Sequence, residues 1–314
     1  MMTSETWKGA SRSFALGSIL YSILTGNIAL SANETKEKRN MVEQQASEPE
    51  KPGWRLTFQD ECSAPELDKT NWFDNYRDGL VRAYRKHNVE GAQNRPPSPT
   101  HYVIRDGILH LRIDKDLPAR AHKHASTVTS VQTSQIVERP DGDGYMANSL
   151  FSQKYGWFEI RCRMPAGSGL HSAFWLLHAD PYDQEFTLKG ERRTIGDGVV
   201  EIDIFEQLGG DVENREIQFN VHFTEDGHHK HRLGSDPSHD FHVYALEWRE
   251  RELIWYIDGK EVRRYKGETP AKEMFVLVGL YQGSGWTGEV DKNMPYPRDF
   301  EVDYVRVYSK QAEE

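Results

Sequence analysis

Short runs of β-branched and aromatic residues, separated by turn residues, recur from Trp54 to Lys310. No long helical period and no internal repeat interrupts this part of the chain. Many short strands with regular turns are typical of a β-sandwich or a β-barrel. The sequence therefore predicts one all-β domain over residues 54–310. The runs that carry this prediction are residues 54–58, 107–113, 155–164, 172–178, 199–205, 216–223, 241–265, 273–281 and 299–308.

The segment LIWYIDGKEVRRY, residues 253–265, adds a local signal and a question about faces. Asp258-Gly259 between two strand-like runs predicts a tight hairpin. Trp255 and Tyr256 are adjacent, so on a strand they point to opposite faces. Two packed sheets bury only one face of each. Aromatic residues on the other face either line a groove, where they stack on sugar rings, or belong to the core after all.

The hexapeptide EIDIFE, residues 201–206, places three carboxylates among apolar residues. Side chains alternate with a period of two along a strand, so Glu201 and Asp203 share a face. Strict alternation would send Glu206 to the opposite face. A β-bulge between Asp203 and Glu206 inserts one residue and restores the face. The spacing therefore predicts a bulge that aims all three acids into one groove, with Ile202 and Ile204 toward the core.

Three acids on one face repel one another, which favours a proton on one of them. Retaining glycoside hydrolysis needs an ionised carboxylate as nucleophile and a protonated one as acid. Two alternatives stay open at this point. The acids could form a solvated strand face, although no Lys or Thr is interspersed. They could also bind calcium, although such sites usually lie in loops rich in Asp, Asn and Gly.

Charge and cysteine content exclude several classes of protein. The chain has a formal net charge of −10, whereas nucleic-acid binders normally present a basic face. We therefore expect no nucleic-acid partner and a neutral substrate. Cys62 and Cys162 are too few for a disulfide framework and lack metal-ligand spacing. They are either two buried thiols or, in an exported protein, one disulfide bond.

The N-terminus resembles a secretory signal peptide. Lys8 and Arg12 precede the apolar run FALGSILYSILTGNIAL, and ALSA at residues 29–32 ends in small residues, as a cleavage site does. An uncleaved amphipathic leader is the alternative. Residues 33–53 are charged, lack a hydrophobic period and are typical of a disordered linker. We expect residues 1–32 to be the signal peptide of a secreted or periplasmic protein, with no membrane association after cleavage.

The segment GVVEIDIFEQLGG, residues 198–210, resembles the signature of glycoside hydrolase family 16 in its bulged branch, which includes laminarinases and agarases. Four other blocks resemble the family in the expected order: residues 55–72, 151–177, 241–262 and 300–308. The resemblance therefore covers nearly all of the chain after the linker. It implies a two-sheet antiparallel β-jelly-roll sandwich with a concave substrate cleft, and an endo-acting, retaining glycosidase.

The resemblance also implies roles for individual residues. Glu201 corresponds to the nucleophile, Glu206 to the acid/base, and Asp203 to the assisting acid between them. Trp175 corresponds to a stacking platform beside the nucleophile, and His222 to a cleft residue near the acid/base. Further substrate-binding candidates are Gln207, Trp286 and Trp157, the last of which lies in either the core or the cleft.

Many family members carry a structural calcium ion on the convex side. The matching positions here are Glu61, Gly107 and Asp303, so a calcium site is an expectation from the resemblance alone. No redox or organic cofactor is implied. We expect a monomer whose partner is its polysaccharide substrate.

The substrate expected from the resemblance is a β-1,3- or mixed-linkage glucan. Typical laminarinases have Trp-Pro before AFW, where this chain has His171-Ser172. Parts of the sequence look more like galactan-acting members, so agar, porphyran or carrageenan is the alternative substrate. A rival from another class is a non-catalytic carbohydrate-binding jelly roll, which would not need all three acids. The segment HHKH, residues 228–231, is expected in a solvated loop.

Overall fold

The computed structural model describes residues 51–74, 101–115, 127–138, 145–178, 185–188, 191–194, 200–211, 215–224, 227–283 and 285–311. These ranges contain β-strands and two short 3₁₀ helices, η2 (Gly209–Asp211) and η3 (Gly285–Thr287). Nowhere within them is there a helix with the length and apolarity needed to cross a membrane. The predicted leader, and the predicted linker up to residue 50, lie outside the described residues.

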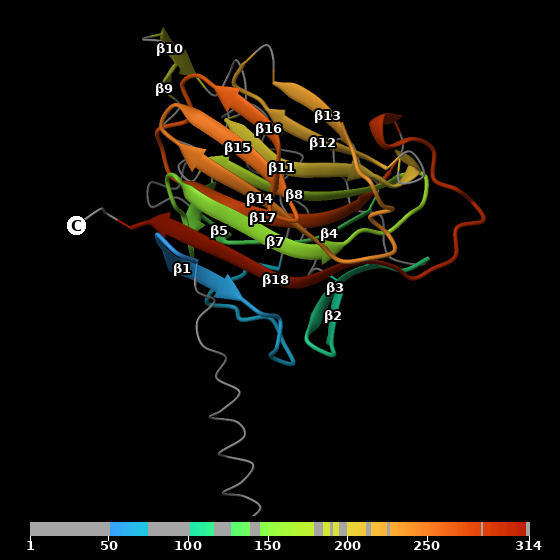
Figure 1. The fold of residues 1–314 in the computed structure, drawn as a ribbon. Coiled ribbons are helices and arrows are strands. Elements are labelled where there is room, and N and C mark those ends of the chain that lie inside the picture. Colours follow the sequence, from blue (N-terminus) through green and yellow to red (C-terminus); the bar gives the residue numbers. More distant parts are fainter. Residues whose placement is uncertain are drawn as a thin grey trace, which may run out of the picture. The chain divides into compact units, whose positions relative to one another are not determined.

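The larger sheet has eight strands, all paired antiparallel (Figure 1). β1 (Trp54–Asp60) pairs with β18 outside the main order. That order is β16 (Lys260–Lys266), β15 (Glu252–Ile257), β14 (His242–Arg249), β7 (Gly156–Arg163), β18 (Arg298–Lys310), β3 (Ile108–Ile113) and β2 (Tyr102–Arg105).

The second large sheet has six strands, also antiparallel, and carries the three acids. Two hairpins complete the described strands: β5 (Ser134–Glu138) with β6 (Tyr145–Ser149), and β9 (Glu185–Leu188) with β10 (Glu191–Thr194). The predicted antiparallel all-β architecture is confirmed. The order of the six strands is β13 (His228–Arg232), β12 (Glu216–Val221), β11 (Glu201–Leu208), β8 (Leu170–His178), β17 (Met274–Gln282) and β4 (Thr127–Gln132).

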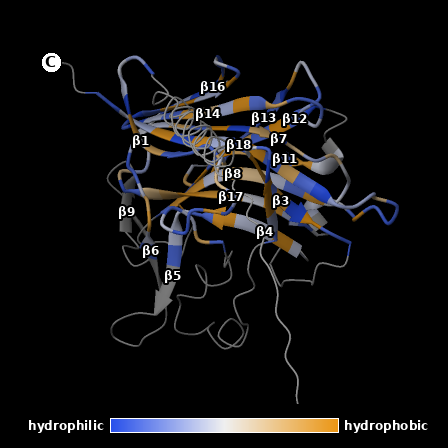
Figure 2. Cartoon of the chain, turned by 90° about the horizontal axis from the view of Figure 1, so that it is seen from below, coloured by the Kyte–Doolittle hydropathy of each residue, from blue (hydrophilic) through white to orange (hydrophobic). Residues whose placement is uncertain are grey.

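The main core is one apolar cluster to which both large sheets contribute. Phe158 and Ile160 of β7 belong to it together with Ile202 and Ile204 of β11, and each is at most 1% exposed. Hydrophobic and hydrophilic segments follow one another along several strands in Figure 2, as strands with one buried face require. Burying each core side chain contributes about 1.5–3 kcal/mol. On those strands the apolar residues therefore mark the internal face.

A second, smaller apolar cluster uses the residues that alternate with the core on β8 and β17. Phe174 and Leu176 face the core, whereas Trp175 and Leu177 belong to the second cluster. This cluster lies on the face of the six-stranded sheet that is turned away from the eight-stranded sheet. Aromatic and aliphatic residues thus occupy both faces of this sheet, as the sequence predicts.

Two local predictions have opposite outcomes. The hairpin at Asp258-Gly259 is confirmed: it joins β15 to β16, and both residues have positive φ, 48° and 75°, as a type I′ turn requires. The predicted loop at residues 228–231 is wrong, because His228–Arg232 form the edge strand β13. Polar residues suit an exposed edge, where they discourage pairing with other chains.

The two cysteines are free thiols, and both are buried. Burial raises the pKa of Cys162 well above its ordinary value. Burial, followed by the charge of Asp60, also raises the pKa of Cys62. The first of the two open alternatives, a pair of buried thiols, describes this structure.

Candidate active site

The predicted β-bulge is present on β11. The register with β12 shifts between Asp203 and Glu206, and the register with β8 shifts between Asp203 and Phe205. Ile202, Ile204 and Phe205 all remain in the core cluster despite the irregular spacing. The extra residue therefore returns Glu206 to the face that carries Glu201 and Asp203.

Asp203 occupies the centre of the site and is almost fully enclosed, with 1% of the residue exposed. Its Oδ2 lies 3.0 Å from Nε2 of His222, and the same nitrogen lies 3.4 Å from Oε1 of Glu201. Its backbone carbonyl accepts a hydrogen bond of 3.2 Å from Trp255 Nε1, which ties the bulge to β15. Burial, then the charge of Glu206 and a hydrogen bond with Glu206, raises the pKa of Asp203 well above its ordinary value. Of the coupled pair, Asp203 is therefore the acid whose protonated form the site favours.

Glu206 has a partner at each carboxyl oxygen. Nε2 of His171 lies 3.1 Å from Oε1, and Asn220 Nδ2 donates a hydrogen bond to Oε2. Asn220 is itself oriented by His228, whose Nδ1 lies 3.0 Å from Asn220 Oδ1. Burial raises the pKa of Glu206, but His171, Asn220 and the charge of His222 outweigh it, so the pKa is lowered overall. The site thus shifts the pKa values of its two buried acids in opposite directions, upward for Asp203 and downward for Glu206.

The raised pKa of Asp203 has a consequence for stability. The folded protein binds this proton more tightly than the unfolded chain, so its stabilising contribution is complete below the ordinary value of 3.8 and is lost as pH rises toward the folded-state pKa. Asparagine copies the shape of protonated aspartate at every pH. We expect Asp203→Asn to be more stable than the wild type at pH 7, with a smaller difference at pH 4. Urea unfolding at both values measures this, and equal differences would contradict it. In a thermal unfolding experiment, a difference of about 1 kcal/mol in the free energy of unfolding between variant and wild type corresponds to about 2–4 °C in Tm.

Three predicted substrate-binding residues lie beside the acids. Trp175 is opposite Asp203 in the register of β8 and β11, but it is only 7% exposed, so little of its ring is open for stacking. His222 follows β12 and contacts two of the acids, as described above. Trp286, in η3, is 48% exposed and meets His171 edge-on, with ring centroids 4.8 Å apart. Trp286 therefore provides the open aromatic surface next to Glu206.

Two predicted substrate-binding residues lie elsewhere, and both predictions are wrong. Trp157 alternates with the core residue Phe158 on β7, so it faces outward from the eight-stranded sheet, across the sandwich from the acids. There it packs on Tyr256, with ring centroids 4.7 Å apart, and Nζ of Lys51 lies 3.5 Å from its ring centroid. Gln207 follows Glu206 but is fully buried, and its side chain donates to the carbonyl of Leu208. Neither residue is placed to contact a substrate in the groove.

The residues expected to hold calcium are engaged otherwise. Glu61 accepts two hydrogen bonds from Arg306, of 2.7 and 2.6 Å, and Asp303 pairs with Arg161. Gly107 lies in the turn between β2 and β3, with φ of 74°. Calcium ligands are oxygens that are free to coordinate. Because both carboxylates are neutralised by guanidinium groups, this arrangement does not fit a preformed calcium site.

Within the described part of the chain, one group could otherwise bring three metal-ligating atoms together. The atoms of Glu201, Asp203 and His222 lie within 4.8 Å of one another. Their mutual contacts account for this closeness, and the raised pKa of Asp203 opposes coordination of a cation, which needs the ionised form.

Sequence reasoning did not assign a role to His171, Asn220 or Tyr281. Tyr281 of β17 stacks on His171, with ring centroids 5.0 Å apart and planes inclined by 25°. His171 was noticed only as a departure from Trp-Pro, and that departure was the available signal. Asn220 lies near the end of β12, two residues before His222, so the period of two places both side chains on the same face. Strand register, which the sequence does not state, brings all three residues to the acids.

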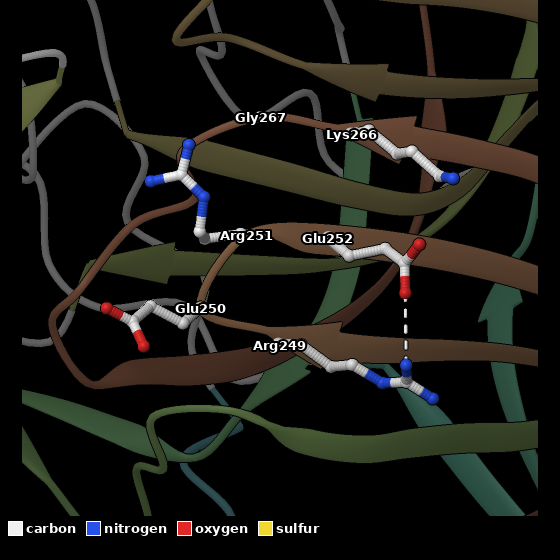
Figure 3. A pocket seen from close by; sticks show the side chains of 6 residues that line it. All are labelled: Arg249, Glu250, Arg251, Glu252, Lys266 and Gly267. Atoms are coloured by element: carbon white, nitrogen blue, oxygen red, sulfur yellow. Dashed lines mark hydrogen bonds and ion pairs between the residues drawn. The ribbon is translucent and has the colours of Figure 1, made fainter.

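A hollow of about 700 Å³ lies on the eight-stranded sheet, at the turn between β14 and β15 (Figure 3). Charged side chains line it, and Figure 3 shows the ion pair of 3.0 Å between Arg249 and Glu252. Arg249 also pairs with Glu247 at 2.6 Å. The hollow contains none of the residues of the acidic site. Its lining residues are Arg249, Glu250, Arg251, Glu252, Lys266 and Gly267.

Comparison with solved structures identifies the fold as that of known glycosidases. An endo-β-galactosidase from Clostridium perfringens that releases GlcNAcα1-4Gal superposes with a TM-score of 0.63 at 25% identity, covering 84% of this chain and 64% of that one. An endo-β-1,3-glucanase from Pyrococcus furiosus gives 0.59 at 25% identity, covering 83% and 96%. A laminarinase from Flavobacterium sp. UMI-01 gives 0.58 at 21% identity, covering 81% and 100%. The predicted jelly-roll sandwich is confirmed.

Sequence comparison leads to the same group of proteins. Endo-1,3-1,4-beta-glycanase ExsH of Rhizobium meliloti (strain 1021) is 29% identical over 208 residues, which are 62% of this chain and 40% of that protein. Glucan endo-1,3-beta-glucosidase A1 of Niallia circulans is 26% identical over 294 residues, 84% of this chain and 39% of that protein. The chain thus spans about two fifths of the length of these curated relatives. The model of glycosyl hydrolases family 16 matches residues 101–306. This chain belongs to glycosyl hydrolases family 16.

Proposed function

We propose that this chain is an endo-acting, retaining β-glycosidase that hydrolyses internal linkages of a β-1,3- or mixed-linkage glucan. The observation that carries the proposal is the bulge of β11, which gathers Glu201, Asp203 and Glu206 on one face of the six-stranded sheet. A solvated strand face would not enclose Asp203 to 1% exposure. A carbohydrate-binding jelly roll would not need a third, protonated acid between two others.

The proposed reaction has two steps. In the first, Glu201 attacks the anomeric carbon and the bond to the leaving sugar breaks, while Glu206 in its protonated form gives its proton to the leaving oxygen. In the second, Glu206 as a carboxylate takes a proton from water, whose oxygen displaces Glu201 from the sugar. Asp203, protonated and adjacent to both, stabilises the negative charge that returns to the carboxylates. Two inversions at one carbon give net retention.

The partners of Glu206 suit the second step in particular. His171 and Asn220 hold its two oxygens and favour the carboxylate, which is the form that acts as a base. The first step requires the protonated form, so its rate depends on how readily Glu206 takes up a proton when the substrate excludes water. Because these opposing demands fall on a single group, its pKa sets the pH range of activity.

Two observations bear on the substrate. The sequence relatives are named for endo-1,3-1,4-beta-glycanase and endo-1,3-beta-glucosidase activities, which favours a β-glucan. A β-galactan is the second candidate, because a structure with a TM-score of 0.63 is an endo-β-galactosidase. The presence of His171, where typical laminarinases have Trp, also supports a β-galactan as the second candidate. We further propose that the protein acts outside the cytoplasm, on the basis of its leader-like N-terminus. A monomer is proposed as its working state.

Release of reducing ends from a panel of polysaccharides tests the function. Laminarin, mixed-linkage β-glucan, agarose, porphyran and carrageenan are each incubated with the wild type and with Glu206→Gln. We expect release from laminarin or the mixed-linkage glucan, reduced about 10²–10⁴-fold in the variant, as loss of a general acid/base predicts. Release from a galactan alone would replace the glucan by the second candidate. Equal release by the variant, or binding without release on every polymer, would contradict the assignment.

A further inference from the structure

We propose that His171 is a positioning residue for the acid/base: it is clamped between Tyr281 and Trp286 and fixes Oε1 of Glu206, while Asn220 fixes Oε2. The inference rests on the proposed function, in which Glu206 is the acid/base. It adds a residue that the established chemistry of two carboxylates does not require. His171 does not react with the sugar, and its effect passes through Glu206.

The clamp holds the imidazole of His171 from two directions. Tyr281 of β17 is directly opposite His171 in the strand register and stacks nearly parallel to its ring. Trp286 of η3 meets the same ring edge-on, at 77°. Only 12% of the His171 side chain is exposed. A ring held in this way has little freedom to turn, so the direction of its Nε2 is fixed by packing.

The floor beneath the clamp is built from small residues. Glu206 is opposite Ala173 on β8, and Ala173 is opposite Gly279 on β17. A Cβ atom at Gly279 would lie 2.6 Å from the hydroxyl oxygen of Tyr281, so glycine makes room for the Tyr281 ring. The Tyr281 ring therefore lies above Gly279 of β17 and stacks on His171 of the neighbouring strand β8. The small residues therefore belong to the same arrangement as the clamp.

Fixing both oxygens matters because Glu206 serves two steps. A carboxyl group that rotates about its last bond presents its oxygen to the leaving group in only part of its orientations. A displacement of about 1 Å in a catalytic group can lower the rate about 10²-fold. Oε1 and Oε2 turn together as one planar group, which Asn220 holds at Oε2 and a hydrogen bond joins to Asp203. His171 adds a contact at Oε1 from the opposite side, since β12 and β8 flank β11 on its two sides, so rotation of the group is resisted from both neighbouring strands.

Charge adds a second effect to orientation. The groups that act on Glu206 are Asp203 on its own strand, His171 from β8, Asn220 from β12 and His222 after β12. Of these, His171 and His222 lower the pKa of Glu206, His171 through a close contact of 3.1 Å between its Nε2 and Oε1 and through its charge. Without His171 the carboxylate loses this stabilisation, so the pKa of Glu206 rises. Activity needs a protonated Glu206 in the first step, and the alkaline limb of the pH profile therefore moves to higher pH.

Three variants separate orientation from charge. His171→Phe keeps an aromatic ring for the clamp but removes the contact with Glu206. His171→Gln keeps an N–H donor near the position of Nε2 but cannot carry a positive charge. His229→Phe is the matched control, because His229 lies on β13 of the same sheet, packs on Phe219 and contacts none of the acids.

Kinetics on two substrates provide the test. On the polysaccharide cleaved by the wild type, we expect His171→Phe to lower kcat/KM about 10–100-fold, and His171→Gln to recover most of this loss. Dinitrophenolate leaves without protonation, so kcat/KM for a dinitrophenyl glycoside of the same sugar should change less than about threefold in both variants. The alkaline limb should shift upward in both and stay in place in His229→Phe. Equal losses on the two substrates, or an unmoved limb, would overturn the proposal and leave His171 a packing residue.

A measurement without substrate keeps this test separate from the proposed function. Carboxyl carbons of ¹³C-labelled glutamate are titrated by NMR, and the Glu206 signal is assigned by its absence in Glu206→Gln. We expect this signal to titrate at higher pH in His171→Phe than in the wild type or in His229→Phe. An unchanged titration would contradict the proposal even if no substrate were found. Inactivity of the wild type on every polysaccharide would instead contradict the proposed function alone.

Discussion

Replacing Glu201 by Ala is expected to abolish hydrolysis of the polysaccharide, with a loss on the order of 10⁵-fold in kcat, and to permit rescue by azide. Glu201 lies at the start of β11, opposite Leu177, and its Oε1 is 3.4 Å from His222 Nε2. In the proposed reaction Glu201 forms the bond to the anomeric carbon. No other described residue takes its place on that side of the sugar. The cavity left by the shorter side chain is large enough to admit a small anion.

The stereochemistry of the rescue product makes this prediction specific. Azide in the space of the missing carboxylate attacks the sugar from the α face in a single displacement, and dinitrophenolate leaves with the bonding electron pair and without a proton from Glu206. One inversion of a β-glycoside gives an α-glycosyl azide, which NMR identifies by its anomeric coupling. A dinitrophenyl glycoside and sodium azide are the reagents, and Glu216→Ala is the control, because Glu216 is an acid on β12 that pairs with Lys230. Full activity of Glu201→Ala, or a β-azide as its product, would show that Glu201 is not the nucleophile.

The arrangement of the acids could be predicted because two periodicities conflict within six residues. Ile202 and Ile204 require a strand with one buried face, and the acids then share the other face only if a residue is inserted between Asp203 and Glu206. The register shift of β11 lies at that place. The hairpin at Asp258-Gly259 was equally local, because its turn type depends on two residues with positive φ. Features set by neighbouring residues in the chain are therefore the ones that the sequence predicts well.

Features set by distant pairing could not be predicted. Trp157 and Phe158 are both aromatic, so the pattern does not say which one enters the core, and Trp157 lies in neither of its two expected places, the core or the cleft. The strand β13 has no apolar alternation, because it lies at a sheet edge and its polar residues are exposed. His171 meets Glu206 only because β8 pairs with β11 in one particular register. In each case the deciding information is which strands are neighbours.

Replacing Glu206 by Ala is expected to lower kcat/KM for the polysaccharide about 10²–10⁴-fold, because the leaving sugar oxygen then departs without a proton. A dinitrophenyl glycoside does not need that proton, so Glu201 should still form the covalent intermediate from it. Water then reacts slowly, since no carboxylate is present to accept its proton. We therefore expect a rapid burst of dinitrophenolate followed by a slow steady state, and measurement in a stopped-flow instrument records both phases.

Azide distinguishes the two carboxylates in this variant as well. It needs no base, so it should attack the intermediate formed on Glu201, accelerate the slow phase and yield a β-glycosyl azide after two inversions. The anomer is thus opposite to the one expected from Glu201→Ala, and the pair of products assigns nucleophile and acid/base independently of any rate. The removed side chain also leaves His171 and Asn220 without their shared partner, so a cavity and two polar groups remain to receive the anion. An α-azide from Glu206→Ala would exchange the roles of Glu201 and Glu206. A variant with no burst and no rescue would show that Glu206 acts only in forming the intermediate, and not also in its hydrolysis.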